Sequence, residues 1–445
     1  MTKIKMIDID DIKPASYNPR TITEQQLENL VKSIKTLGCV IPVLVNSNNN
    51  TIVAGHQRTK AMKRLGIKKV PVFFIKGVSK YDEARFNQFH NGIDLGKKGE
   101  ATGPKCDSFN TMDNKLFKVI KWNPSRVKAI CRLMVKYGNC LSCVLNDNEV
   151  VYGIDYVKAC KLLNYDVNCY GTSEYSKSDD FLNQDYGEFY YGNFEKDTYV
   201  QGLAQMSRLP KKGKKHHSKL YEKMVIPFIE QAGNHDFVDF GAGKAEYCNL
   251  YNGYPVEFFQ HKGDKIQVGK GNKMIDQLID HLKTKGLFDF AVCDSVINST
   301  DSMKAELSVL ACLHTLTNGP VFISGRTKKD VIRGLNSSKS TDKVNYDYFM
   351  DRDGFTASFR KGHWYYQHFH DKDSFIDEIN RVGFELVKWT ENSSSFQAQL
   401  RKSDELSKQQ IADAINYEFN LPLPMGGSYN RQNDVIQVLK DLDIL

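Results

Sequence analysis

The residues with the clearest chemical potential lie around a turn of small residues in the second half of the chain. An apolar stretch, Phe237–Phe240, contains Asp239 and runs into a Gly-Ala-Gly turn at 241–243. Small residues let the backbone approach a ligand, and the helix expected at about 245–251 would point its free N–H groups at that ligand. A later apolar stretch ends in Asp294. The pattern predicts a ligand-binding site made of two carboxylates and a glycine turn.

A second glycine turn lies near the N-terminus. Gly55 stands between an apolar run and a helical pattern, and His56, Gln57 and Arg58 follow it directly. A glycine at a strand-to-helix junction leaves N–H groups free at the start of the helix, and a histidine and an arginine beside them would complete a cradle for phosphate. A tight turn with an exposed arginine would have the same sequence, so the surrounding elements must decide.

Three histidines in the segment 327–370 could supply a base. A neutral imidazole, with an unperturbed pKa of about 6.5, suits proton removal at neutral pH. His368 and His370 follow a strand-like WYYQ run, so their side chains should face one side, whereas His363 should face the other. We predict that His368 and His370 are catalytic. Their His-x-His spacing could also serve a metal ion, but the sequence shows no further ligand beside it, and we expect no metal site.

The elements that position the first glycine turn form a compact α/β pattern. A capping box at Thr23–Gln26 precedes a helical pattern that ends at Gly38. Two β-branched runs, at 40–46 and 51–55, flank a polar turn and predict a hairpin. A helix at 57–65 and a further strand should follow, which places the glycine turn between a strand and a helix.

A weaker copy of this module follows in the chain. The stretch KYGNCLSCVLNDNEVVYGIDYVKACKLLNYDVNCY repeats its pattern and aligns Gly153 with Gly55. Ile154 and Tyr156 stand in place of the histidine and the arginine. We therefore interpret this copy as a structural duplicate that lacks the candidate phosphate ligands.

From residue 218 onward helical and strand patterns alternate, which predicts a doubly wound parallel sheet. The last segment is predicted to be a helical tail. The expected organisation of the whole chain is 1–94, 106–208, 218–402 and 403–445, with polar linkers between the first three parts.

The first module resembles a known family. The segments YNPR, SIKTLG, IPVLVN and IVAGHQRTKAMKRLGIKKVPV, in this order, are similar to the N-terminal domain of ParB-like proteins, whose fold is shared with sulfiredoxin. The resemblance implies that this module binds the phosphates of a nucleoside triphosphate or of a nucleic acid. The implied phosphate-binding residues are Arg20, Gly55, His56, Gln57 and Arg58.

The third module resembles the class I S-adenosylmethionine (SAM)-dependent methyltransferases. The D-x-G-x-G turn, the Phe-Asp pair before the strand that ends in Asp294, and the closing segments VGFELVKWTE and FQAQLRK carry this likeness. It implies SAM as the cofactor. The second strand, PVEFFQ, ends at Gln260, where the family usually has an acidic residue for the ribose hydroxyls. The implied cofactor-binding residues are Asp239, Gly241, Gly243, Gln260 and Asp294.

Other sequence features narrow the acceptor and the partners. The Asp-Pro-Pro-Tyr motif of methylases that act on base amines does not follow Asp294, so standard base methylation is not expected. The net charge of +8 lies entirely in residues 1–100, which hold 17 Lys and Arg against 9 Asp and Glu. A localised basic surface favours polyanions, although solvated lysines give the same count. The sequence shows neither a long uncharged apolar run nor a signal peptide, and we expect a cytoplasmic protein without membrane contact.

The sequence thus predicts an α/β chain with a ParB-like α+β domain, a degenerate ParB-like repeat and a C-terminal Rossmann-like methyltransferase domain. The leading hypothesis is a SAM-dependent methyltransferase that the ParB-like domain directs to a nucleic-acid or nucleotide-linked acceptor. The expected partner is a nucleic acid, in the first place DNA, or a nucleotide. The alternative is a noncatalytic, DNA-associated, nucleotide-binding regulator whose third module is degenerate.

Overall fold

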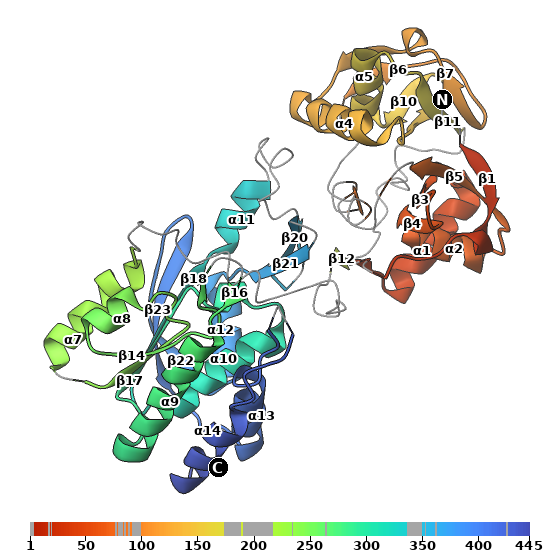
Figure 1. Cartoon of the computed structure of the whole chain (residues 1–445). Helices are drawn as coiled ribbons and strands as arrows, with labels where there is room; N and C mark the ends of the chain where they lie inside the picture. Colours follow the sequence, from red (N-terminus) through yellow and green to blue (C-terminus); the bar gives the residue numbers. More distant parts are fainter. Residues whose placement is uncertain are drawn as a thin grey trace. The chain divides into compact units, whose positions relative to one another are not determined.

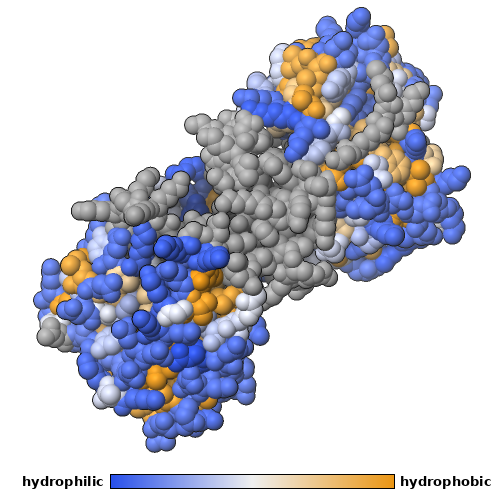
Figure 2. Space-filling model, in the orientation of Figure 1, coloured by the Kyte–Doolittle hydropathy of each residue, from blue (hydrophilic) through white to orange (hydrophobic). Residues whose placement is uncertain are grey.

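The computed structural model forms two compact units, Met1–Tyr190 with Ser338–Arg352 and Tyr191–Ser337 with Asp353–Leu445 (Figure 1). The structure describes residues 4–75, 99–172, 217–335 and 349–445 except 17, 19, 234, 263–264, 352, 361–362 and 424–425, and also positions 78, 83, 86–87, 90 and 188–189. Within this described part, no helix has both the length and the apolar character needed to cross a bilayer. On the face drawn in Figure 2 the described surface is mainly hydrophilic, with small separate apolar patches.

The first half of unit 1 has the predicted helix and hairpin. Its sheet has the order β1-β5-β3-β4, in which β3 and β5 are parallel and the other pairs antiparallel. The predicted capping box at Thr23 and Gln26 is present, and α1 ends at Gly38. The elements are β1 (Lys5–Asp8), η1 (Ile9–Asp11), β2 (Arg20–Thr21), α1 (Glu24–Leu37), β3 (Val43–Asn46), β4 (Thr51–Ala54), α2 (His56–Arg64) and β5 (Lys69–Ile75).

The second half of unit 1 repeats this topology. In its sheet, of order β7-β11-β9-β10-β6-β8, the first four strands take the places and directions of β1, β5, β3 and β4. In both halves a glycine with positive φ, Gly55 or Gly153, precedes the second helix. The duplication predicted from sequence is therefore present in the fold. The elements are β6 (Glu100–Thr102), β7 (Phe109–Met112), η2 (Asn114–Leu116), β8 (Lys118–Lys121), α4 (Pro124–Tyr137), β9 (Cys143–Asn146), β10 (Glu149–Tyr152), α5 (Ile154–Leu163) and β11 (Val167–Gly171). The remaining short strands in the residue ranges of unit 1 are β12 (Glu188–Phe189) and β19 (Phe349–Met350).

The two halves of unit 1 share a hydrophobic core. On β3, Val43 and Val45 face a cluster that contains α1 and α2, whereas Leu44 belongs to a cluster that also contains α4, α5, β9 and β11 of the second half. Because successive strand residues face opposite sides, the first sheet buries both of its faces, one of them against the second copy. The two copies therefore stabilise each other, and experiments on this unit require the full chain.

Unit 2 is a doubly wound, Rossmann-like sheet with helices on both faces, as predicted. The sheet has the order β14-β13-β17-β18-β23-β22, its first four strands are parallel, and β23 is antiparallel to both of its neighbours. The elements are η4 (Tyr221–Val225), α7 (Ile226–Ala232), β13 (Phe237–Phe240), α8 (Glu246–Leu250), β14 (Tyr254–Val256), β15 (His261–Lys262), β16 (Lys265–Ile266), α9 (Val268–Lys285), β17 (Phe290–Asp294), η5 (Ile297–Ser299), α10 (Met303–Leu316), β18 (Val321–Arg326), α11 (Lys328–Leu335), β20 (Phe355–Arg360), β21 (His363–His368), α12 (Lys372–Asn380), β22 (Phe384–Glu391), β23 (Ser395–Lys402), α13 (Lys408–Glu418) and α14 (Gln432–Asp441).

Both faces of this sheet are covered, as the near-continuous apolar strands require. On β13, Val238 and Phe240 pack into a cluster that contains α9, α10 and α12, whereas Phe237 packs with η4 and α8. The predicted tail joins the first of these clusters through α13 and α14, and the hydroxyl of Tyr429 donates to the carbonyl of Phe258 at 2.6 Å. The tail therefore belongs to unit 2 and covers its core.

The glycine turn of the second copy, at Gly153, gives a test of the duplicated fold. Gly153 has φ of +85°, and a Cβ there would lie 2.9 Å from the Cα of Cys143. Gly66 has φ of +71°, but a Cβ there would meet no atom within 4 Å. Positive φ alone costs a non-glycine residue about 1–2 kcal/mol. We expect Gly153→Ala to lower the melting temperature of the full chain and the hydrogen-exchange protection of α5 clearly more than the control Gly66→Ala does. Equal losses would show that the close contact with β9 does not constrain this turn.

Candidate functional site

A cavity of about 320 Å³ opens at the carboxyl ends of β13 and β17. Small-molecule sites usually fall between about 300 and 1,000 Å³, so its size suits a small ligand. The chain continues from β13 to β14 on one side and reaches β17 on the other, so the cavity lies where ligands bind in doubly wound sheets. Its lining residues are Tyr221, Asp239, Gly241, Ala242, Gly243, Lys244, Glu246, Tyr247, Asp294, Ser295, Asn298, Arg326 and Gln367.

Asp239 is held on the floor of the cavity by a tyrosine. The hydroxyl of Tyr221 donates to Asp239 Oδ2 at 2.6 Å, and the Tyr221 ring stacks on Tyr247 with centroids 4.9 Å apart. Burial, together with the neighbouring Asp239 carboxylate, raises the pKa of Tyr221 well above its ordinary value. The phenol therefore stays protonated and keeps donating to the carboxylate, while the stacked rings form one wall.

Asp294 lies on the other side of the cavity, at the end of β17. The hydroxyl of Ser324 donates to Asp294 Oδ1 at 2.5 Å, and Ser295, at φ of +62°, lies beside it with its hydroxyl 3.2 Å from the same oxygen. The sharp turn at Ser295 directs the chain away from the sheet and leaves the carboxylate at the cavity. Asp239 and Asp294 thus face one small volume, and Glu246 adds a third carboxylate to the lining. These three negative charges exceed the two positive charges of Lys244 and Arg326 in the same lining, which favours a cationic ligand group.

The carboxylate of Glu257, which the sequence analysis does not predict as a site residue, holds the glycine turn in place. Glu257 is the first residue after β14; its Oε2 accepts from the N–H of Gly243 and its Oε1 from that of Phe259, both at 2.8 Å. Gln260 does not line the cavity. Its side-chain amide donates to the carbonyl of Gly243 at 2.8 Å. The expectation that the second strand ends at Gln260 is therefore corrected: β14 ends at Val256, and an acidic residue does follow it.

Gly241 is required by its surroundings. It has φ of +82°, and a Cβ there would lie 2.2 Å from Cγ2 of Val296. Only glycine brings the backbone so close to the η5 turn, which also carries Asn298 to the cavity. The glycines predicted at 241 and 243 thus shape the cavity.

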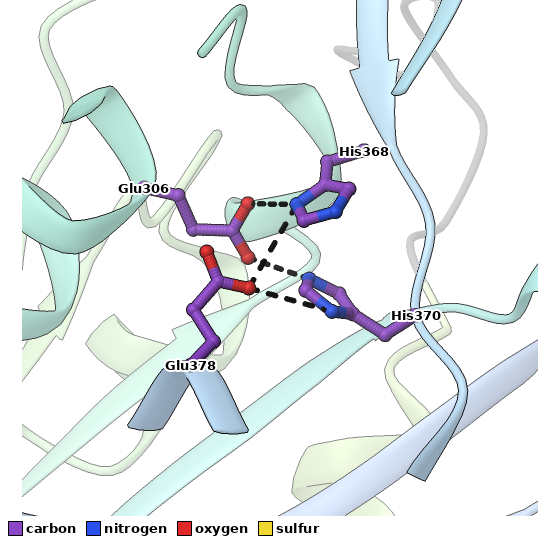
Figure 3. A group of neighbouring side chains, drawn as sticks. All are labelled: Glu306, His368, His370 and Glu378. Carbon is purple, nitrogen blue, oxygen red and sulfur yellow. Dashed lines mark hydrogen bonds and ion pairs between the residues drawn. The ribbon is translucent and has the colours of Figure 1, made fainter. Parts of the chain in front are cut away.

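The two histidines predicted to be catalytic lie inside the protein. The side chains of His368 and His370 are 1% and 0% exposed, and neither lines the cavity. As the strand alternation predicts, they point the same way, and both contact the carboxylate of Glu306 on α10 (Figure 3). Among the described residues of segment 327–370, Gln367 on β21, directly before His368, reaches the lining of the cavity. The side chain of His363 lies outside the described residues, so its use as a control stays a prediction.

The turn at Gly55 has the predicted geometry of a strand-to-helix junction. Gly55 caps α2 with φ of +106°, and no side chain caps the helix start. The Nε2 atom of His56 accepts the N–H of Ala15 at 3.1 Å, which fixes the neutral tautomer with the proton on Nδ1. Burial, and then the charges of Lys60 and Arg58, lower the pKa of His56 to about 4. A neutral, buried imidazole is a poor electrostatic partner for phosphate in the conformation described.

Arginine side chains do gather beside this turn. Burial, followed by the charges of Arg58 and then Arg20, lowers the pKa of His90 to about 3, so both positive charges act on this histidine. Gln57 ties the two segments together, because its side-chain amide donates to the carbonyl of Arg20 at 3.1 Å. The structure therefore brings the predicted phosphate-binding residues into one cluster, to which His90 is an addition that sequence spacing did not reveal.

Arg58 also has a role in the fold. Its guanidinium donates to the carbonyls of Ile41 and Pro42. In the second copy Tyr156 stands at this position, and its hydroxyl donates to Asn139 Oδ1 at 2.8 Å and accepts from the N–H of Asn168 at 3.0 Å. Both side chains bond to a neighbouring loop, so this position supports the fold in each copy, with a charge in the first copy alone.

Comparison with known proteins shows which family the N-terminal part of the chain resembles. Residues 1–91 match the family model of the ParB N-terminal domain. The ParB-like nuclease domain-containing protein YnaK of Escherichia coli is 33% identical over 85 residues, which cover 19% of this chain and 97% of that protein. A probable chromosome-partitioning protein ParB of Campylobacter jejuni is 39% identical over 71 residues, 15% of this chain and 26% of that protein. The match thus spans about a quarter of the length of the partitioning protein.

Solved structures also resemble parts of this chain. A C-terminally truncated ParB from Caulobacter crescentus, complexed with CTP-gamma-S, is 26% identical, with 20% of this chain and 52% of that chain covered and a TM-score of 0.19. A S-adenosylmethionine-dependent methyltransferase from Clostridium acetobutylicum is 10% identical, with 42% and 93% covered and a TM-score of 0.29.

The neutral state of His56 gives a prediction on pH. Its folded pKa, about 4, lies below the value of about 6.5 expected for an unfolded chain, so the stability it contributes is present above pH 6.5 and is lost as the pH falls toward 4. A titration of the full chain with labelled histidine, followed by NMR, should show the His56 imidazole protonating near pH 4. His56→Gln should flatten the fall in melting temperature between pH 6.5 and 4, although His90 contributes in the same direction. An imidazole that titrates near 6.5 would contradict the buried hydrogen bond to Ala15.

Proposed function

Because the chain belongs, through residues 1–91, to the ParB N-terminal domain family, we propose that its first unit binds nucleotide or nucleic-acid phosphates and directs the second unit, a SAM-dependent methyltransferase, to its acceptor. The proposed acceptor is a nucleic acid or a nucleotide-linked molecule. The relatives supply the family of residues 1–91, and the remaining parts of the proposal rest on the cavity and on charge.

The observation that carries the methyltransferase proposal is the cavity at the ends of β13 and β17. It combines a glycine turn that admits a ligand close to the backbone, three carboxylates and a stacked tyrosine wall. These features fit SAM, whose amino and sulfonium groups are positive and whose adenine offers a flat face for stacking. The bound cofactor would supply an activated methyl group.

The chain's own contribution to such a reaction is position. Methyl transfer is an in-line displacement, in which holding the two reactants in line supplies much of the rate. Asp239, fixed by Tyr221, and the turn at Gly241 would orient the cofactor, and Glu257 and Gln260 would hold that turn by its Gly243 backbone. Gln367 and Asn298, on other elements of the lining, would contact the acceptor.

The base role of His368 and His370 stays a prediction without support from the cavity. Both imidazoles are buried against Glu306 and have no contact with the lined volume. Within the lining, the carboxylates of Asp294 and Glu246 are the groups that could accept a proton from an acceptor.

The proposed nucleic-acid partner rests on charge and on the gathered arginines. The whole positive excess of the chain lies in residues 1–100, and the charges of Arg20 and Arg58 both act on His90. Arg58 lies in the first turn of α2, and Arg20 is joined to that turn by Gln57. A helix start with free N–H groups and two guanidinium groups is suited to phosphate.

Titration calorimetry of the full chain with SAM tests the second unit. We expect binding at one site per chain. Asp239→Asn should weaken it by about tenfold or more, because a charge-assisted contact contributes about 1.5–3 kcal/mol. Gly241→Arg should abolish it, since a side chain there would enter the cavity and meet Val296. The control Asp413→Asn removes the same charge from the exposed face of α13 and should leave the affinity unchanged.

The absence of heat and of a thermal shift at millimolar SAM would favour the alternative, a noncatalytic regulator with a degenerate Rossmann domain. Where SAM binds, transfer of a radiolabelled methyl group to DNA, RNA or free nucleotides would identify the acceptor class.

The first unit is tested with nucleoside triphosphates and short duplex DNA. Lys60, exposed on α2 and close enough to His56 to lower its pKa, is a sharper probe than Arg58, whose loss also breaks bonds to two carbonyls. We expect Lys60→Glu to weaken binding and Lys158→Glu, at the aligned position of the second copy, to leave it near wild type. DNA affinity should also fall steeply as salt rises, because phosphate contacts release counterions. Equal effects of the two substitutions would contradict a site at α2.

A further inference from the structure

A cluster of four buried side chains lies behind the cavity of unit 2. Their side chains are between 0% and 3% exposed, and one nitrogen or oxygen atom from each lies within 4.8 Å of the others (Figure 3). They come from α10 and, more than fifty residues later in the chain, from the end of β21 with the residues after it and from α12. The four residues are Glu306, His368, His370 and Glu378.

The contacts within the cluster are short and centred on one carboxylate. His368 Nδ1 lies 2.5 Å from Glu306 Oε2, and His370 Nε2 lies 2.6 Å from Glu306 Oε1. Glu378 Oε2 lies 3.5 Å from His370 Nδ1 and 3.9 Å from His368 Nδ1. Within the described part of the chain, His370 Nδ1 and Glu378 Oε1 have no hydrogen-bond partner. Among the residues described, His370 and Glu378 thus each have a buried polar atom without a hydrogen-bond partner.

We propose that this cluster binds one divalent transition-metal ion, with Zn²⁺ the best-fitting probe, through Glu306, His368, His370 and Glu378. Zinc takes imidazole nitrogens and carboxylate oxygens at about 2.0–2.2 Å in a tetrahedron, which sets the ligand atoms about 3.3–3.6 Å apart. The contacts in the cluster range from 2.5 to 3.9 Å and all four ligand atoms lie within 4.8 Å of one another, so the distances lie on both sides of this spacing. Side-chain shifts of about 1 Å would therefore complete the coordination.

Charge supports the same assignment. Two carboxylates buried in an apolar environment need two compensating positive charges. A divalent cation with two neutral imidazoles supplies them and leaves the site neutral. Without a metal, the same four groups must share two protons in addition to the one that each neutral imidazole carries.

The surroundings of His368 have the form found around metal-bound histidines. Its Nδ1 points into the cluster, while its Nε2–H donates to the carbonyl of Asp353 at 2.9 Å and its ring stacks on Phe355. Such an outer hydrogen bond fixes the tautomer and orientation of a ligating imidazole. The rings of Phe375 and Phe396 meet His370 edge-on and keep the site dry.

The four side chains are almost fully buried, so the role of the site is structural. A buried, four-ligand set leaves no position for a substrate. The ion would hold both α12 and the β20–β21 hairpin against α10. It would thereby fix the position of Gln367, which precedes His368 in the sequence and lines the cavity. Imidazoles that hold a metal are not available as general bases, so this assignment and a catalytic role of the two histidines exclude each other. The proposal does not depend on the methyltransferase activity.

The test is the metal content and spectrum of the full chain, expressed without a histidine tag. Wild type should hold about one Zn²⁺ per chain by elemental analysis. Replacing it with Co²⁺ should give visible absorption bands of the intensity typical of tetrahedral coordination. Removal of the ion with a chelator should lower the melting temperature of unit 2.

Glu378→Gln keeps the volume of the side chain but removes its charge, and should reduce Zn²⁺ affinity at least tenfold. The control His314→Gln removes a buried histidine of the same unit that donates to the carbonyl of Asp404, outside the cluster, and should keep full metal content. Folded wild type that holds no Zn²⁺ and gives no Co²⁺ bands would overturn the proposal and leave a proton-sharing network. Wild-type affinity in Glu378→Gln would also overturn it. If that variant does not fold, the Co²⁺ spectrum of wild type decides alone.

Discussion

The burial of the charged Glu306 carboxylate is the constraint on which the second unit depends most. This carboxylate is fully buried near the start of α10, where an isolated charge would be very costly. Although burial alone would raise the pKa of Glu306, the two histidines lower it to about 2, so the group is ionised. It must therefore keep His368 and His370 beside it. Because of this requirement, the segment around His368 and His370, more than sixty residues later in the chain, packs against α10.

That constraint reaches the candidate site through strand alternation. His368 points into the buried cluster, so its neighbour Gln367 points away from the cluster and into the lining of the cavity. One strand thus has a structural residue and a pocket residue side by side. Any group that neutralises Glu306, whether a metal ion or shared protons, also fixes one wall of the cavity. The chemistry of the cluster therefore acts on the site by position.

Most of the architecture follows from local sequence patterns. The capping box at Thr23, the glycine turns at Gly55 and Gly241, and the alternation of apolar strands and helices are short-range signals, and each is found where it was predicted. The internal repeat was visible because both copies keep the residues that form the fold. The facing direction of His368 and His370 also followed from the two-residue period of a strand.

The features that the sequence did not reveal depend on contacts between distant segments. Glu306 and Glu378 look like ordinary helical carboxylates, and only the folded chain shows that they meet two histidines. The end of the second strand was misplaced because β14 is three residues long and the apolar pair after Glu257 continues its pattern. His90 lies near Arg20 and Arg58 through the fold of unit 1, with no spacing that indicates it.

The two copies in unit 1 show how a fold can keep a position and change its chemistry. Arg58 and Tyr156 occupy equivalent sites after the helix-capping glycines, and each bonds to a neighbouring loop of its own copy. Removing the charge at this position therefore leaves the architecture intact, provided that the replacement can still reach the loop.

Asp155, beside Tyr156, is buried and pairs with Arg126 at 2.9 Å, whereas Gln57 at the corresponding position bonds to the carbonyl of Arg20. In the second copy the polar groups at this turn are thus used for internal bonds. The first copy adds the guanidinium groups of Arg20 and Arg58 near one helix start, and this difference in charge, rather than any difference in fold, is what makes the first copy the better phosphate-binding candidate.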